Sequence, residues 1–390
     1  MLATELSLNE SKQYIVNNIN LQLSNNSKNI SSSILFLSGK PGTGKSSLVE
    51  QIVKELDYSL NVKYMSTMLI EQISGLPIPP KENDVDYKWS RSELVSENNL
   101  RIKSSKNNSP VILFLDDAHL CSKSIQSYMF QLLTYKSIHD HKLENNVVII
   151  MAGNNSLDKA GATPILSPIV NRICFINIVA EATDWLNHFA ISYGVRQDII
   201  SFIELYPDLL QSEPTETIPF ASPRSWTHYS DSLTQLELIK KLDIDDYLVL
   251  GKGHIGLEYA SKFSEYIQLF TKWDAKSFLS GQIPLPDFKT LSKIENYTFM
   301  SSLIAELLKD LRSEKSDKLR PESEIKLSIV KVVFNQLVDS CKEIIPLGLR
   351  TLVCNKSSIH GGNTLIYYKL IDNNPVLLEV AKKLLSVKTK

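Results

Sequence analysis

A glycine-rich loop between an apolar run and a helical segment constrains this chain more than any other feature. In the stretch 34–50, ILFLSGKPGTGKSSLVE, Gly39, Gly44, Lys45 and Ser46 match the spacing G-x-x-x-x-G-K-[ST]. Glycines let the backbone approach an anion closely, and the N–H groups of the loop and of the following helix end then face that anion. Lys45 can reach the β- and γ-phosphates, and the Ser46 hydroxyl can complete the coordination of Mg²⁺. The loop therefore predicts a nucleotide-phosphate site rather than an ordinary strand-to-helix turn that happens to hold a lysine.

Two further apolar runs end in polar residues that suit the same site. PVILFLDDAH, residues 110–119, has the character of a buried parallel strand and ends in two carboxylates. Asp116 can hold Mg²⁺ through water, and Asp117 can orient or deprotonate the attacking water. The run 147–151 leads to Asn154, whose amide can bond the attacking water or the γ-phosphate. An acidic turn and an Asn-rich turn are the alternatives, and the preceding phosphate loop favours the site in both cases.

Two arginines are candidates for contacts with phosphate. Arg172 lies beyond the nucleotide-binding edge of the expected sheet, where it is badly placed for its own site but well placed to enter a neighbour's. A solvated or salt-bridged arginine is the alternative for this residue. Ser222 as N-cap and Pro223 at the first helical position predict a helix start that exposes Arg224 at its head.

The order of the segments predicts an α/β protein with a parallel sheet flanked by helices, followed by an all-α region. We expect a helical lead over residues 1–30, a nucleotide-binding core over 31–182, helices over 183–300, and a mixed or helical extension of unknown role over 301–390. Residues 67–95 form an irregular insertion, because glycine and three prolines exclude a long helix there. A glycine-containing turn, GKGHIG at 251–256, is expected between two helices, and TLVCN and NTLIYYKLI in the extension look strand-like.

Composition bounds the classes of partner and compartment. The chain of 390 residues has 42 basic and 43 acidic residues. Its net charge therefore does not favour nucleic acid or an anionic membrane as partner. The four cysteines lie far apart without a zinc-binding spacing, which favours reduced, structural thiols. The N-terminal sequence lacks the pattern of a signal peptide, and no apolar run approaches the length of a membrane span. We therefore expect a cytoplasmic protein.

Several motifs, taken in order, resemble the AAA+ ATPases and within them the MoxR-like branch. These motifs are GKPGTGKS, ILFLDDAH, IIMAGNN, the pair Asn171-Arg172, and SPRSW, and the resemblance covers about residues 30–300. It implies ATP and Mg²⁺ as ligands and a helical lid over residues 183–300. It also implies roles for the candidate residues: nucleotide binding by Gly39, Pro41, Gly42, Thr43, Gly44, Lys45, Ser46 and Ser47; Mg²⁺ coordination by Ser46 and Asp116; catalysis by Asp117, Asn154 as sensor 1, Arg172 as arginine finger and Arg224 as sensor 2.

The resemblance also implies a function and an assembly. It indicates an ATP-hydrolysing, chaperone-like remodelling motor that acts on a protein partner. The motor would form a homo-oligomer, a hexameric ring, and would work with a von Willebrand factor A domain protein. The insertion at 67–95 would face the central pore of that ring.

Two departures from the family pattern keep other functions open. Asp117 stands where the family usually has glutamate, and Thr163 and Pro164 stand where it often has a basic pair. A slowly hydrolysing, ATP-gated assembly module is therefore the first alternative. A DNA-replication initiator or loader is the second, which the neutral net charge disfavours. A metabolic kinase fits the helical lid less well.

Overall fold

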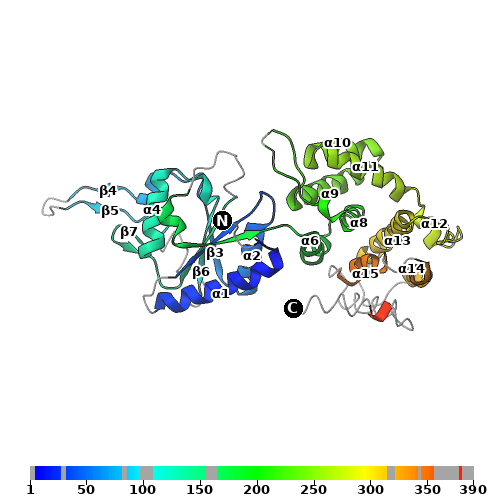
Figure 1. The fold of residues 1–390 in the computed structure, drawn as a ribbon, viewed down its shortest axis with the longest axis horizontal. Coiled ribbons are helices and arrows are strands. Elements are labelled where there is room, and N and C mark those ends of the chain that lie inside the picture. Colours follow the sequence, from blue (N-terminus) through cyan, green and yellow to red (C-terminus); the bar gives the residue numbers. More distant parts are fainter. Residues whose placement is uncertain are drawn as a thin grey trace. The chain divides into compact units, whose positions relative to one another are not determined.

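The computed structural model describes residues 5–27, 32–80, 86–96, 109–154, 165–215, 217–313, 321–340, 344–354 and 377–379. The chain divides into two compact units, Met1–Ala180 and Glu181–Lys390, each of which is described by itself (Figure 1).

The first unit is built on the parallel sheet that the sequence predicts. Its six strands are, in spatial order, β1 (Glu5–Leu6), β10 (Ile173–Ile178), β2 (Ile34–Ser38), β9 (Val147–Ala152), β6 (Val111–Asp116) and β3 (Ser59–Tyr64). Every neighbouring pair is parallel. β2, which carries the phosphate loop, is paired on one side with β10 and on the other with β9. The expected α/β fold class is confirmed.

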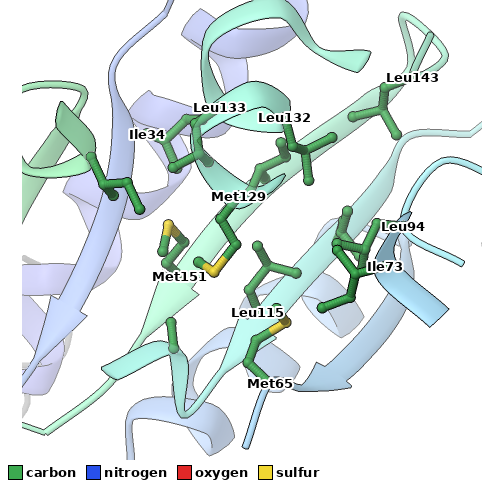
Figure 2. Close-up of a cluster of buried hydrophobic side chains, with 14 of the residues drawn as sticks. Ile34, Met65, Ile73, Leu94, Leu115, Met129, Leu132, Leu133, Leu143 and Met151 are labelled. Carbon is green, nitrogen blue, oxygen red and sulfur yellow. The ribbon is translucent and has the colours of Figure 1, made fainter. Parts of the chain in front are cut away.

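Alternation along the strands sends side chains to both faces of this sheet, and each face is covered by helices. Ile34 and Phe36 of β2 pack on the face that carries α3 (Ile70–Ser74), α4 (Lys123–Tyr135) and α5 (Ser167–Val170). Figure 2 shows this cluster around Met129 and Met151. Leu35 and Leu37 pack on the opposite face, under α1 (Leu8–Ser27) and α2 (Lys45–Glu55). Strands buried on both faces have the continuous apolar runs from which they were predicted.

The N-terminal lead belongs to this unit more closely than the sequence indicates. Its first two described residues form β1, which pairs with the end of β10. The buried side chain of Gln22, on α1, donates to the carbonyl oxygen of Ile149 at 2.8 Å and accepts from the N–H of the same residue at 3.1 Å. The amide of Asn26 donates to the carbonyl oxygen of Val147 at 3.0 Å. α1 is thus fastened to the sheet by side-chain hydrogen bonds to the backbone of β9.

The insertion at 67–95 holds the short helix α3 and a hairpin of β4 (Pro77–Ile78) and β5 (Lys88–Trp89). The hairpin extends away from the sheet (Figure 1). Trp89 at its base stacks on His139 with ring centroids 4.2 Å apart, and the Trp89 carbonyl is 2.8 Å from Nε2 of His141. Both histidines belong to a second hairpin, formed by β7 (Ser137–Ile138) and β8 (His141–Lys142). The absence of a long helix in this insertion agrees with the prediction for its described residues.

The regular elements that the structure describes in the second unit are all helical. Its elements are α6 (Ala182–Trp185), a π-helical turn (Leu186–Ala190), α7 (Ile191–Tyr193), α8 (Gln197–Leu205), a 3₁₀ turn (Pro207–Leu209), α9 (Pro223–Glu237), α10 (Ile244–Ile255), α11 (Leu257–Thr271), α12 (Ala275–Leu279), α13 (Lys293–Ser313), α14 (Pro321–Ser340) and α15 (Ile345–Cys354). α13 runs across residues 300 and 301, so the lid and the extension share a continuous helix.

Two expectations about local structure in this unit are wrong. The segment predicted as the GKGHIG turn is helical up to Ile255, and α10 ends only at Gly256, whose φ is 85°. A Cβ atom on Gly251 would lie 2.8 Å from Cβ of Ala260 on α11. Gly251 therefore allows α10 and α11 to pack closely, and it does not form a turn. Residues 351–354 of TLVCN are the last turn of α15, not a strand, while Asn355 and NTLIYYKLI lie outside the described residues.

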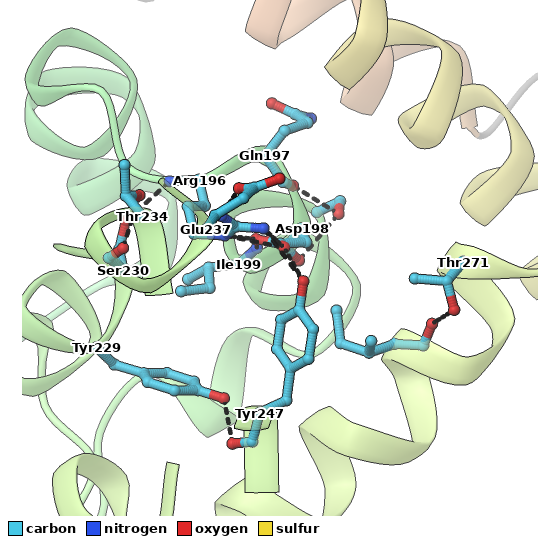
Figure 3. A network of polar contacts seen from close by, with 12 residues as sticks. Arg196, Gln197, Asp198, Ile199, Tyr229, Ser230, Thr234, Glu237, Tyr247 and Thr271 are labelled. Carbon is cyan, nitrogen blue, oxygen red and sulfur yellow. Dashed lines mark hydrogen bonds and ion pairs between the residues drawn. The ribbon is translucent and has the colours of Figure 1, made fainter. Parts of the chain in front are cut away.

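Charged side chains connect the helices of the second unit to one another. Arg196, just before α8, forms an ion pair with Asp198 at 2.8 Å and also contacts Glu237 at the end of α9. The hydroxyl of Tyr247, on α10, donates to Asp198 at 3.3 Å (Figure 3). Three helices of the unit, α8, α9 and α10, therefore meet at one buried polar cluster.

Candidate nucleotide-binding site

The loop after β2 has the backbone geometry that a phosphate cradle requires. Gly42 and Gly44 have φ values of 76° and 103°, in the left-handed region that glycine adopts without steric cost. Gly44 is the N-cap of α2 and supplies no side-chain hydrogen bond to that helix. The positive end of α2 is therefore directed at the loop, which is where an anion is stabilised.

Lys45, the first residue of α2, places its ammonium group inside this loop. Its Nζ donates to the carbonyl oxygens of Gly39 at 2.8 Å and Lys40 at 3.0 Å, and to Oδ1 of Asn154 at 3.3 Å. The residue is only 8% exposed. An ammonium group at this position in the loop is placed to donate to the oxygens of an anionic ligand such as a phosphate.

Ser46 and Asp116 meet beside the loop although 70 residues separate them in the sequence. The Ser46 hydroxyl, on the first turn of α2, donates to Oδ2 of Asp116, at the end of β6, at 2.7 Å. A hydroxyl oxygen and a carboxylate oxygen are hard ligands of the kind that Mg²⁺ takes from proteins next to phosphates. The two residues fit the expected Mg²⁺ site.

Asp117 begins the turn that follows β6. Its backbone is left-handed, with φ 53° and ψ 33°, and it precedes the 3₁₀ turn η3 (Ala118–Leu120). Its N–H donates to Oδ1 of Asp116 at 3.0 Å, so the two carboxylate-bearing residues are held in a fixed relation. Aspartate and asparagine enter the left-handed region more readily than most residues with a side chain. This backbone conformation gives a physical reason for aspartate at a position where the resembling family has glutamate.

Asn154 lies at the end of β9 and is bound from two sides. Its side-chain oxygen accepts from Lys45, and its backbone N–H donates to Nδ1 of His119 at 3.2 Å. His119 is buried in η3. The sequence analysis assigned it no role, although its position two residues after Asp117 was a signal that it lies near the site.

The remaining loop residues differ in their surroundings. Thr43 is buried, and its hydroxyl donates to the carbonyl oxygen of Lys40 and closes the loop. Pro41 is half-buried within the loop, and Ser47 is exposed on the first turn of α2. Thr163 and Pro164, the second departure from the family pattern, lie outside the described residues.

Arg172 is not part of this cluster. It immediately precedes β10, and its carbonyl oxygen accepts from the N–H of Ile34, the first residue of β2. The phosphate loop follows the other end of β2, and a strand of five residues spans about 15 Å. The guanidinium lies 4.4 Å from the centre of the Phe130 ring and donates to the carbonyl oxygen of Pro168 at 2.8 Å. Within its own subunit, Arg172 therefore lies at the opposite edge of the sheet from Lys45.

Arg224 belongs to the second unit. α9 begins at Pro223 as predicted, with a capping box formed by Ser222 and Ser225. Arg224 is exposed on the first turn of this helix. Its exposure at the head of the helix agrees with the sequence analysis, and its contact with a phosphate as sensor 2 stays a prediction.

Cys121 is a buried free cysteine close to the carboxylates. Burial, and secondarily the negative charge of Asp117, raise the pKa of its thiol to about 12. A thiol that stays protonated is a poor nucleophile, so Cys121 contributes packing rather than reactivity.

Comparison with known proteins identifies the domain that carries this site. Residues 35–172 match the family model described as ATPase family associated with various cellular activities (AAA). Residues 35–172 form an AAA ATPase domain. No curated protein matches the chain.

Solved structures of RuvB from Thermotoga maritima are similar to the chain at low identity. One described as the Holliday junction branch migration motor has 13% identity over 70% of this chain and 77% of that chain, with a TM-score of 0.33. A single-residue variant of the same protein has 14% identity over 81% of this chain and 92% of that chain, with a TM-score of 0.35. At these scores, nothing about the activity or partner of this chain follows from RuvB.

Among the described helices of the chain, none has the length and apolarity that crossing a membrane requires.

Proposed function

We propose that the chain is a MoxR-like AAA+ ATPase that binds ATP with Mg²⁺, hydrolyses it between subunits of a homo-oligomer, and remodels a protein partner. The observation that carries this proposal is the meeting of Lys45, Ser46, Asp116 and Asn154 at the carboxyl ends of β2, β6 and β9. In parallel sheets with crossover helices, ligands bind at this edge.

The residues of the site divide the work of hydrolysis. The phosphate loop and Lys45 would bind the β- and γ-phosphates, and Ser46 and Asp116 would hold Mg²⁺, which when bound neutralises charge on the phosphate oxygens. Asp117 would accept a proton from the attacking water, and the amide of Asn154 would orient that water. Sensor 2 would be Arg224.

The position of Arg172 supports a site completed by a neighbouring subunit. An arginine at the opposite edge of the sheet from its own phosphate loop is suited to a head-to-tail contact, in which one subunit's Arg172 reaches the next subunit's nucleotide. Such contacts close into rings when the rotation between subunits allows it. We propose a hexamer, on the resemblance to the MoxR-like branch, and a von Willebrand factor A domain protein as partner on the same ground.

The experiment that tests this function measures assembly size and ATP turnover in the same sample, with and without ATP. We expect ATP-dependent assembly and Mg²⁺-dependent turnover in the wild-type protein. Lys45→Ala should abolish both, because it removes the buried charge that binds phosphate. Lys54→Ala, on the last turn of the same helix, is the matched control and should leave both unchanged. Wild-type protein that neither binds nor hydrolyses ATP would overturn the proposal.

Asp117 favours a second candidate, an ATP-gated assembly module with little hydrolysis. The aspartate side chain is one methylene shorter than the usual glutamate, so its carboxylate reaches less far toward a water. ATP-dependent assembly together with slow turnover that no partner stimulates would favour this candidate over a motor.

A further inference from the structure

His119 connects the two halves of the site that come from different strands. It is the middle residue of η3, three positions after Asp116 and two after Asp117. Its ring nitrogen Nδ1 is 3.2 Å from the backbone nitrogen of Asn154, which lies at the end of the neighbouring strand β9. Its side chain is thus a direct link between the turn that carries the carboxylates and the loop that carries the amide.

Packing against Gly153 holds the His119 ring in place independently of the hydrogen bond. A Cβ atom placed on Gly153 would lie 2.8 Å from Nδ1 of His119 and 2.8 Å from Cζ of Phe36. The imidazole therefore occupies the space that a side chain at position 153 would need. With His119 5% exposed, the ring has a defined position between β2 and the end of β9.

The hydrogen bond also defines the protonation state of the imidazole. The backbone N–H of Asn154 is the donor, so Nδ1 is the acceptor and carries no proton. His119 is therefore neutral in this arrangement, with its proton on Nε2. In this state it can hold a backbone amide but adds no positive charge to the site.

We propose that His119 is a positioning residue for ATP hydrolysis, which holds Asn154 in place relative to Asp117. This inference rests on the proposed hydrolytic function. An attacking water between the Asn154 amide and the Asp117 carboxylate must be held from both sides, and misplacing one side lowers the rate of the chemical step. The Lys45 contact restrains the Asn154 side chain, while His119 restrains its backbone.

Three substitutions separate the hydrogen bond from the packing. His119→Phe keeps a ring against Gly153 but removes the acceptor. His119→Asn places an amide oxygen on Cγ, where the histidine has Nδ1, and keeps the acceptor. His119→Gln carries its amide one bond further out and is the mismatched control.

We expect His119→Phe to lower kcat by about tenfold, because the loss of about one hydrogen bond raises the activation free energy by a corresponding amount. The Kd for ATP should change by less than about twofold. His119→Asn should recover most of the lost turnover, and His119→Gln should not. Equal kcat in wild type and His119→Phe would overturn the inference, as would equal turnover in the Asn and Gln variants. If the Phe variant does not fold, the comparison of Asn with Gln decides.

A double-mutant cycle distinguishes positioning from a general structural role. Asn154→Ala keeps the backbone N–H but removes the amide side chain that His119 is proposed to position. Adding His119→Phe to Asn154→Ala should therefore change kcat by less than about twofold, because nothing is left to position. A further loss of about tenfold in the double variant would mean that His119 supports the fold in general, and would overturn the inference. Wild-type protein without turnover would instead overturn the proposed function itself, and this inference with it.

Discussion

At the scale of single residues, the backbone of Asp117 limits where its carboxylate can lie. Its left-handed backbone and its N–H bond to Asp116 fix the start of η3, and both features suit a short side chain. The position of the carboxylate that would activate water therefore depends on the backbone of the turn, because the aspartate side chain is too short to adjust it much.

We predict that Asp117→Asn lowers ATP turnover by about a hundredfold, because the amide cannot accept the proton of the attacking water. The Kd for ATP should stay close to that of the wild type, since Lys45 and Ser46 are untouched. Asparagine enters the left-handed region as readily as aspartate, so the fold should be unaffected. Steady-state turnover and nucleotide titration on one preparation measure both quantities. Turnover at the wild-type rate would exclude Asp117 as the general base.

The sequence predicted those site residues whose chemistry follows from spacing and strand ends. The loop spacing identified Lys45 and Ser46, and two apolar runs that end in polar residues identified Asp116 and Asn154, which the structure brings together. The role of His119 could not be predicted this way. Its contact with Asn154 depends on β6 and β9 being neighbours in the sheet. The order of strands in a sheet cannot be predicted from the sequence of a single segment.

At the scale of elements, the carboxyl group of Glu204 lies where three helices of the second unit meet. This α8 carboxylate is buried, accepts from the hydroxyl of Tyr297 on α13 at 3.0 Å, and lies 3.5 Å from Nη1 of Arg350 on α15. Burial raises its pKa to about 8, although Arg350 and the Tyr297 hydroxyl oppose that shift. The carboxyl of Glu204 is therefore largely protonated in the folded protein at neutral pH.

We predict that the stability of the second unit falls as pH rises from about 5 to about 8, and that Glu204→Gln weakens this dependence. In the unfolded chain Glu204 ionises near its ordinary pKa of 4.5, whereas the folded unit keeps the proton up to about pH 8. Between these values the unfolded state binds fewer protons, so rising pH favours unfolding. Denaturant unfolding at both pH values measures the effect, with the exposed Glu265→Gln as control. An unchanged pH dependence in Glu204→Gln would contradict the prediction.

Elements with a strong apolar pattern were predicted, and those that depend on distant partners were not. The buried runs of β2, β6 and β9 have the pattern of strands whatever their neighbours. β1 is only two residues long, and it forms a strand because it pairs with the free edge of β10. Likewise, Gly251 lies within α10 and leaves room for Ala260 of α11, a contact between two helices that the local sequence does not reveal.

At the scale of the whole molecule, the position of Arg172 supports the proposal that a neighbouring subunit completes the ATPase site. The guanidinium is held at the edge of the sheet by the Phe130 ring and the Pro168 carbonyl, away from its own phosphate loop. In our proposal, a residue so placed acts in hydrolysis when a second copy presents its phosphate loop to this edge, in a head-to-tail contact.

We predict that two inactive variants restore each other's activity when mixed. Arg172→Ala keeps its own nucleotide site but lacks the finger, and Asp117→Asn keeps the finger and ATP binding but lacks the general base. In an equal mixture, about a quarter of head-to-tail contacts pair an intact nucleotide site with an intact finger, so turnover should recover to about a quarter of the wild-type rate. ATP turnover measured against mixing ratio should rise to a maximum near equal amounts. Turnover that stays at the level of the separate variants, or full activity of Arg172→Ala alone, would show that Arg172 does not act in a neighbouring subunit.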